Sequence, residues 1–295
     1  MTAKIAMNVT TTFHGNVRTD LRAARDAGFA GVELQSPKLY RYLDAGFRPE
    51  DVRALAGDLV VTGLGAVQDV ERQGDAHDEF VADVERMADI AVAVGAPSVQ
   101  LCTGPSDWRV VRDFRFGGLD VDDPRYRGTL GRSEQDALDA VARNVRTAAD
   151  IAADRGLRVF VEPLAWTNVN RCEQLLRLVD AVGRDNVRIA VDFWHFWLVG
   201  DTLAEVAALP AELIEAVHVS DATPIDLARE VPNVADHRDV IIGGGAIPLQ
   251  EWVDAVKATG YDGWWVTEMF STRADEHEFG DVARTMRGLV ELLVS

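Results

Sequence analysis

Four short stretches in the second half of the chain place a carboxylate or an imidazole inside or directly after an apolar run. They are VFVEPL with Glu162, VRIAVDF with Asp192, AVHVSD with His218, and WWVTEMF with Glu268. Ionisable side chains are costly in apolar surroundings unless a partner compensates them. One divalent cation would compensate all four, and three carboxylates with one imidazole suit Mn²⁺, Mg²⁺ or Co²⁺ better than a structural zinc site. The sequence therefore predicts one divalent metal ion, with Mn²⁺ as the expected ion.

Each of these residues also has an ordinary structural interpretation. A glutamate at a strand end is often paired at the surface, Asp192 could cap the following segment, and His218 could be a hydrogen-bonded core histidine. Four such coincidences at four comparable positions are improbable together, and the joint pattern favours the metal site.

The elements that would position these residues alternate regularly. Strands are predicted at 4–9, 31–35, 59–67, 98–103, 158–164, 187–193, 216–221 and 263–270. Amphipathic helices are predicted at 19–27, 76–94, 133–155, 173–182, 202–208, 248–259 and 275–292. This alternation predicts an α/β fold, a (β/α)₈ barrel formed by residues 1–295 as a single domain. A doubly wound sheet is the rival, but no GxGxxG follows the first strand. In such barrels the chemistry lies at the carboxyl ends of the strands, where the four residues would meet.

Composition excludes several classes of partner. The net charge of −18 argues against a nucleic-acid surface and against docking on anionic membranes. Two cysteines do not form a disulfide framework, and no run of 18 apolar residues predicts a membrane span. A cytoplasmic protein acting on a small molecule is the expectation.

An ordered series of motifs resembles one known family. VEPL, VDFWH, HVSD, RDVIIGGGAIPL and TEMF, preceded by LRAARDAGFAGVELQ, are similar to the successive signatures of the xylose-isomerase-like TIM barrels. That family of sugar isomerases and epimerases includes ketose 3-epimerases and related inosose and hydroxypyruvate enzymes. The resemblance covers nearly the whole chain and weakens between about residues 104 and 132. It implies a carbohydrate substrate and a homo-oligomer, either a dimer or a tetramer.

The resemblance also implies a role for each residue. Glu162, Asp192, His218 and Glu268 would hold one divalent metal, and the two glutamates would exchange a proton on opposite faces of a substrate carbon. His195 would contact the substrate; a histidine merely packed between its aromatic neighbours is the alternative. Arg238 would bind substrate hydroxyls, with the loop residue Arg229 as a weaker candidate. The expected enzyme is a divalent-metal-dependent isomerase or epimerase of a ketose or related polyol, acting through an enediolate.

Two features depart from a plain ketose 3-epimerase. Asn168 stands where those enzymes usually carry a second glutamate that contacts the substrate. Trp108 and Trp166 follow predicted strands, and aromatic faces at a barrel mouth suit a sugar face or an aromatic substituent. We expect all three to bind substrate. The alternative function is therefore a lyase on the same metal site, either a dehydratase or an enzyme that cleaves a glycoside by elimination.

A long loop follows the fourth predicted strand. Residues 104–132 contain six arginines and five aspartates, which predicts either a lid, a subunit contact, an anion-binding segment, or pairing of the arginines with the aspartates of the same loop. Two further functions fit less well. An endonuclease would need more histidines and a basic face, and a non-catalytic binding protein would be expected to lack a ligand.

Overall fold

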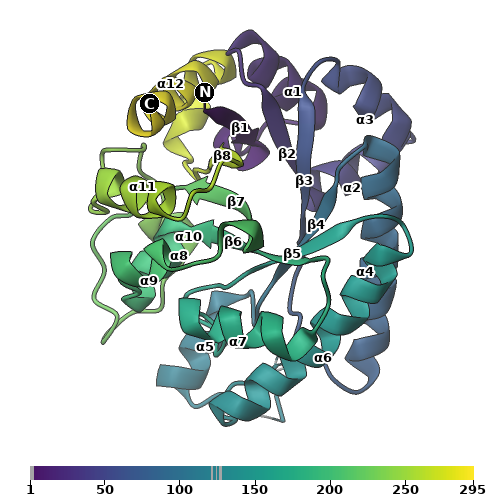
Figure 1. Cartoon of the computed structure of the whole chain (residues 1–295), viewed down its shortest axis with the longest axis vertical. Coiled ribbons are helices and arrows are strands. Elements are labelled where there is room, and N and C mark those ends of the chain that lie inside the picture. The colour runs from purple at the N-terminus through teal and green to yellow at the C-terminus, as the bar shows by residue number, and fades with distance from the viewer. Residues whose placement is uncertain (1–2, 121, 124, 126–127) are drawn as a thin grey trace.

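The computed structural model is a closed barrel of eight parallel strands in sequence order, β1 to β8 (Figure 1). It describes residues 3–120, 122–123, 125 and 128–295. The strands are β1 (Lys4–Asn8), β2 (Gly31–Gln35), β3 (Val60–Val67), β4 (Ser98–Cys102), β5 (Arg158–Glu162), β6 (Val187–Asp192), β7 (Ile214–Val219) and β8 (Trp264–Thr267). The predicted fold class is thus confirmed, and every predicted strand is present with ends shifted by at most three residues.

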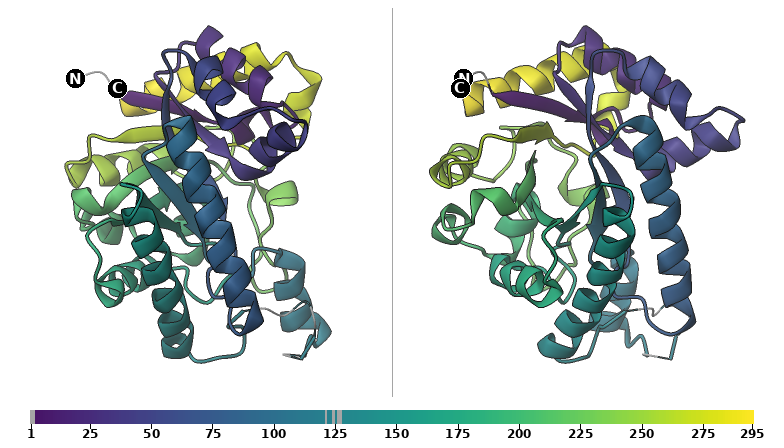
Figure 2. Two further views of the ribbon diagram at one scale, coloured as in Figure 1. Left: turned by 90° about the vertical axis from the view of Figure 1, so that its right-hand side faces the viewer. Right: turned by 45° about the vertical axis from the view of Figure 1, so that its right-hand side comes forward.

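Helices surround the barrel, and the N- and C-terminal segments lie side by side where β1 pairs with β8 (Figure 2). They are α1 (Val17–Asp26), α2 (Ser36–Asp44), α3 (Pro49–Ala56), α4 (Asp75–Val94), α5 (Trp108–Arg112), α6 (Glu134–Ala153), α7 (Cys172–Val182), α8 (Phe193–Val199), α9 (Leu203–Ala207), α10 (Val234–His237), α11 (Leu249–Ala258) and α12 (Phe279–Val294). Short helical turns add η1 (Val9–Thr12), η2 (Asp113–Gly117), η3 (Ala211–Leu213) and η4 (Arg273–Glu276). The helices α2, α3, α5, α8 and α10 were not predicted from the sequence.

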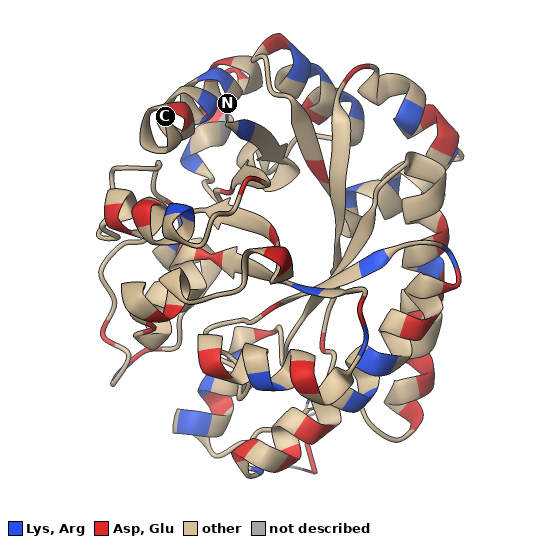
Figure 3. Cartoon of the chain, in the orientation of Figure 1, with Lys and Arg blue, Asp and Glu red and all other residues tan. Residues whose placement is uncertain are grey.

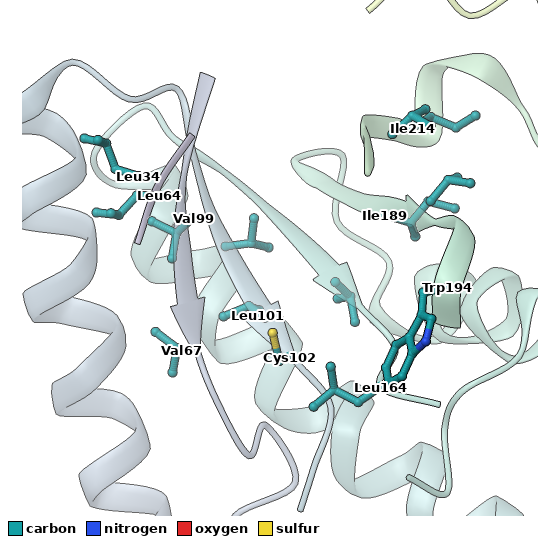
Figure 4. Packing of buried hydrophobic residues seen from close by; sticks show 14 of the residues in the cluster. Leu34, Leu64, Val67, Val99, Leu101, Cys102, Leu164, Ile189, Trp194 and Ile214 are labelled. Carbon is teal, nitrogen blue, oxygen red and sulfur yellow. The ribbon is translucent and has the colours of Figure 1, made fainter. Parts of the chain in front are cut away.

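Successive side chains of each strand point in opposite directions, so one set faces the surrounding helices and the other faces the barrel interior. Residues such as Leu34, Leu64, Val99 and Leu101 pack in one large apolar cluster that joins strands to helices (Figure 4). The opposite set fills the barrel interior. Ala6, Ala216 and Val266 form a separate small apolar cluster there. Polar residues follow towards the carboxyl ends, so the barrel presents its chemistry at one rim.

Charged residues are distributed with both signs interspersed over the outer helices (Figure 3). Such a surface is typical of a protein whose acidity serves solubility. Within the described part of the chain, no helix combines the length and apolar character needed to cross a bilayer.

Candidate metal centre

The four predicted ligands come together in space. Glu162, Asp192, His218 and Glu268 each offer one ligand atom, and these atoms lie within 4.8 Å of one another. All four side chains are buried, with exposed fractions between 0% and 5%. Three of the residues belong to β5, β6 and β7, and Glu268 directly follows β8, where its amide bonds to the Val219 carbonyl. The barrel therefore delivers four donors from consecutive strands to one point.

Glu162 divides its two oxygens between different partners. Its Oε1 lies 2.9 Å from Nδ1 of His218. Its Oε2 accepts from Nε2 of Gln100 at 2.8 Å and from the Cys102 thiol at 3.4 Å. Burial raises the pKa of Glu162, but the hydrogen bond and charge of His218 outweigh burial and hold this pKa below its usual value. One oxygen thus faces the ligand cluster while the other is held by neutral donors from β4.

Asp192 is fixed by the start of α8. Its Oδ1 accepts from the amide of Trp194 at 2.7 Å and from the hydroxyl of Ser220 at 2.8 Å. Its Oδ2 faces Arg238 Nη2 at 3.2 Å. Burial opposes ionisation here too, but the nearby Arg238 charge lowers the pKa of Asp192. The capping role and the ligand role considered from the sequence are therefore compatible, since each uses its own oxygen.

Arg238 forms the cationic side of the centre. Its Nη2 donates to Glu268 Oε2 at 2.6 Å, and its guanidinium carbon lies 4.9 Å from the Trp194 ring centre and 4.7 Å from that of Phe270. The two aromatic rings hold the Arg238 guanidinium at the ligand cluster, in a position consistent with the substrate-binding role predicted for it. The weaker candidate, Arg229, has an 85% exposed side chain beside Asp226.

A fourth carboxylate and an amide that the sequence analysis did not identify complete the centre. Glu33 at the end of β2 is 1% exposed, and one of its oxygens lies 3.1 Å from Nε2 of His218. Asn8 at the end of β1 donates through Nδ2 to Glu33 at 2.8 Å and to Glu268 at 3.4 Å. The signal was available in GVELQ, where an acidic residue interrupts a buried strand.

The charges of these groups fit a divalent cation. Asp192 and Glu268 contact Arg238, while Glu33 and Glu162 contact His218. Four buried carboxylates thus share one arginine and one imidazole, and the described residues leave negative charge uncompensated even when both of these groups are cationic. Burial raises the pKa of Glu268 to about 8, although Arg238 opposes this. Burial lowers the pKa of His218, but the charges of Glu33 and Glu268 outweigh burial and raise this pKa. A cation among the ligand atoms would favour the deprotonated form of both groups. The oxygen-rich donor set is the kind that suits hard divalent ions.

A cavity of about 650 Å³ opens above the centre. Both glutamates of the cluster line it, together with His195, Arg238 and aromatic residues that include Trp108 and Trp166. His195 Nδ1 accepts the Ala165 amide at 3.0 Å, so the neutral ring carries its proton on Nε2. Burial lowers the pKa of His195, which favours this neutral form.

Trp166 and Asn168 hold the loop that follows β4. The Trp166 indole donates to the Pro105 carbonyl at 2.8 Å, and the Asn168 amide donates to the Thr129 carbonyl at 2.6 Å. Asn168 does not line the cavity, unlike Trp166, so its geometry favours anchoring over the predicted substrate contact. The missing glutamate of the ketose 3-epimerase pattern is thus replaced by a residue that binds the chain itself.

The loop at 104–132 contains α5 and η2 rather than only irregular chain. Its arginines pair with its own aspartates, since Arg125 contacts both Asp113 and Asp123, and Arg112 contacts Asp113. These exposed pairs match the internal-pairing alternative. Arg127, counted among the six arginines, lies outside the described residues.

Comparison with known proteins gives matches over almost the whole chain. The family model described as xylose isomerase-like TIM barrel matches residues 21–289. A 3-dehydroshikimate dehydratase of Pseudomonas aeruginosa is 29% identical over 89% of this chain, which spans only 37% of that protein. An inosose isomerase of Bacillus velezensis is 21% identical over 99% of this chain and 97% of its own length. A crystal structure of IOLI protein with a binding zinc atom superimposes with a TM-score of 0.84 at 20% identity, covering 99% of this chain and 98% of that one.

Proposed function

Since the chain belongs to the xylose isomerase-like TIM barrel family, we propose that it is a divalent-metal-dependent enzyme that isomerises or epimerises a hydroxylated ketone. The reaction proceeds by removal of a proton next to the carbonyl and through an enediolate. The observation that supports this most is the placing of two glutamates of the ligand cluster, Glu162 and Glu268, in the wall of one cavity.

The two glutamates are proposed to move the proton. A carboxylate has two oxygens, so one can face a cation while the other reaches a substrate proton. Glu162 shows this division, because its Oε1 lies at the cluster and its Oε2 is held by Gln100 and Cys102. Glu268 is held by Arg238 and Asn8 on its two oxygens. One glutamate removes the proton, and the other returns it on the opposite face when the product is an epimer.

Glu162, Asp192, His218 and Glu268 are the residues proposed to hold the cation, and Mn²⁺ remains the predicted ion. When bound, a divalent cation supplies electrostatic stabilisation of the negative oxygen that develops in the enediolate.

His195 and Arg238 are proposed to bind substrate oxygens. The Nε2–H of neutral His195 is a donor for a substrate hydroxyl or carbonyl, because Nδ1 is occupied by the Ala165 amide. Trp108 and Trp166 supply apolar surface in the cavity wall for the carbon face of a ring.

A lyase reaction on the same site is the second candidate, and the match to a dehydratase favours it. Inososes and 3-dehydroshikimate are both hydroxylated six-membered ring ketones, so both can lose a proton next to a carbonyl. If a leaving group stands one carbon further on, the same enediolate expels it. We therefore propose a cyclic hydroxylated ketone as the first substrate class to test.

Proton NMR in D₂O distinguishes these reactions. The enzyme is loaded with Mg²⁺, which is diamagnetic, and is offered inososes, 3-dehydroshikimate, free ketoses and keto-glycosides with an aromatic substituent. Deuterium entering the carbon beside the carbonyl, with an isomer appearing, is the expected result for an isomerase or epimerase. Loss of water or of the substituent would assign the lyase reaction instead.

The control uses Asp192→Asn, which removes one proposed ligand charge and spares both glutamates. We expect this variant to lose exchange by about 10–100-fold. Exchange at the wild-type rate in this variant would contradict a role for the centre in the reaction.

A further inference from the structure

The imidazole of His218 is held between two different carboxylate environments. Its Nδ1 faces the ligand cluster, at 2.9 Å from Glu162 Oε1 and 3.7 Å from Glu268 Oε2. Its Nε2 faces away from the cluster, at 3.1 Å and 3.3 Å from the two oxygens of Glu33. His218 and Glu33 are 0% and 1% exposed, so water does not compete for this contact. The two ring nitrogens therefore have separate roles.

Neighbouring strands hold Glu33 in this position. The Asn8 amide oxygen accepts the Thr10 amide at 2.9 Å, which directs the Asn8 Nδ2 to Glu33 Oε1 at 2.8 Å. Gly63 of β3 lies against the other oxygen, because a Cβ built there would be in ordinary van der Waals contact with Glu33 Oε2 at 3.5 Å. Glu33 is thus held from β1 by Asn8 and packs against β3.

We propose that Glu33 is a positioning residue of the metal centre: it accepts the Nε2–H of His218 and so presents the unprotonated Nδ1 to the cation. This inference rests on the metal centre of the proposed function and adds to it a residue that does not itself ligate. Glu33 acts only through His218.

The physical reason lies in the two tautomers of a neutral imidazole. One nitrogen carries the proton and the other the lone pair, so the acceptor at one nitrogen decides which one can bind a cation. A carboxylate at Nε2 selects the Nδ1 lone pair, restrains the ring against rotation and raises the basicity of the ligating nitrogen. His218 is the single imidazole in an otherwise oxygen set, so its orientation has no substitute within the cluster.

The test measures cation affinity rather than turnover. Purified wild-type protein, Glu33→Gln, Glu33→Ala and the control Glu71→Gln are stripped with a chelator and titrated with Mn²⁺ and Zn²⁺ by competition with a chromophoric chelator. Glu71 is also a buried glutamate, but it accepts the Gly104 amide in the loop after β4. We expect about 10–100-fold weaker binding for the Glu33 variants and unchanged binding for Glu71→Gln.

A double-mutant cycle tests whether Glu33 works through the histidine. The same affinities are measured for His218→Ala and for Glu33→Gln combined with His218→Ala. Because Glu33 has no other route to the cation in this account, the Glu33→Gln change should cause no further loss once the imidazole is gone. Glu33→Gln keeps the shape of the side chain and serves if Glu33→Ala fails to fold.

Two results would overturn the inference while leaving the proposed function intact. One is wild-type affinity in Glu33→Gln. The other is the same fold loss from Glu33→Gln with and without His218, which would indicate general damage to the barrel. Absence of cation binding by the wild-type protein would overturn both the inference and the proposed function, so the two failures are distinguishable.

Discussion

At the scale of single residues, Glu268 carries the most specific expectation. Glu268→Gln keeps an oxygen able to face a cation but removes the group able to accept a proton. We expect kcat for solvent deuterium exchange to fall by at least about 100-fold. Thermal unfolding and metal content, measured on the same preparation, should show that the fold and the ion are retained.

The half-buried pair of Arg287 and Glu291 on α12 provides the control for Glu268. Glu291→Gln removes a carboxylate that lies on α12 and does not line the cavity, so it should leave exchange unchanged. Full activity in Glu268→Gln with the ion bound would remove Glu268 from the proton transfer.

Residue types showed which side chains could meet, but not what each one contacts. The four candidate ligands could be found in the sequence because each lies in or directly after an apolar strand, and a charge there needs compensation. Glu33 carried the same signal in β2, but the pattern in the later strands had already supplied a complete ligand set. Asn168 is a residue whose role could not be predicted from its type. Its amide donates to the Thr129 carbonyl, and this contact exists only in the folded loop.

At the scale of elements, two carboxylates tie together the connections that follow β3 and β4. The Glu71 side chain accepts the Gly104 amide at 2.8 Å, and Asp69 accepts the Ser106 amide at 2.6 Å. The other oxygen of Glu71 is buried with no partner among the described residues. Burial, together with the Asp69 charge, raises the pKa of Glu71 to about 8. The loop that bounds the cavity is thus attached to β3 through a carboxyl group that favours its neutral form.

This raised pKa predicts a pH dependence of stability. In the unfolded chain Glu71 loses its proton near pH 4.5, but in the folded protein it keeps the proton until about pH 8. Stability from this group is therefore complete below pH 4.5 and is lost as pH rises towards 8. Glu71→Gln mimics the neutral form, so it should exceed wild-type stability by about 1–3 kcal/mol at pH 8. Urea unfolding from pH 4.5 to 8 measures the difference.

The gain should shrink to near zero at pH 4.5, where wild-type Glu71 is also neutral. Glu173→Gln, at an exposed position in the first turn of α7, serves as the control and should show no such gain. A Glu71→Gln difference that is the same at every pH would contradict the raised pKa.

The positions of the strands and long helices could be predicted better than the short helices and the close contacts between strands. Strands were recognised because buried parallel strands are short β-rich runs bounded by turn residues. The short helices α5, α8 and α10 were not predicted, because segments of four to seven residues hold too little periodicity to show a face. Gly65 illustrates a further limit. A Cβ there would lie 2.0 Å from Gln100 Oε1, so this glycine makes room for the amide that holds Glu162, which no local pattern reveals.

At the scale of the whole molecule, the barrel explains why residues from positions 8 to 268 form one centre. Parallel strands in sequence order bring every carboxyl end to one rim, and β8 closes on β1. The first and last strands thus contribute Asn8 and Glu268 to the same hydrogen-bonded group. A dimer or tetramer remains a prediction from family resemblance, and a cytoplasmic location remains a prediction from the sequence.

The cavity sets the size of substrate that the whole molecule can take. Its volume of about 650 Å³ lies within the range of small-molecule sites and leaves room for more than a bare monosaccharide. Exposed Phe13 lines it and packs edge-on against Phe270 at 5.9 Å. This aromatic lining agrees with a ring ketone or a substrate with an apolar substituent, and both belong in the exchange experiment.

The central claim is that β5 to β8 deliver four side chains to one divalent cation. The most direct measurement combines metal content with the thermal unfolding midpoint of one preparation, before chelation, after chelation and after the ion is restored. A cation that binds only the folded chain stabilises it, so about 100 Kd of free ion should raise Tm by about 5–10 °C. We expect one ion per chain and a reversible fall in Tm on its removal. An unchanged Tm after complete and verified removal of metal, or a chain that takes up no divalent ion, would contradict it.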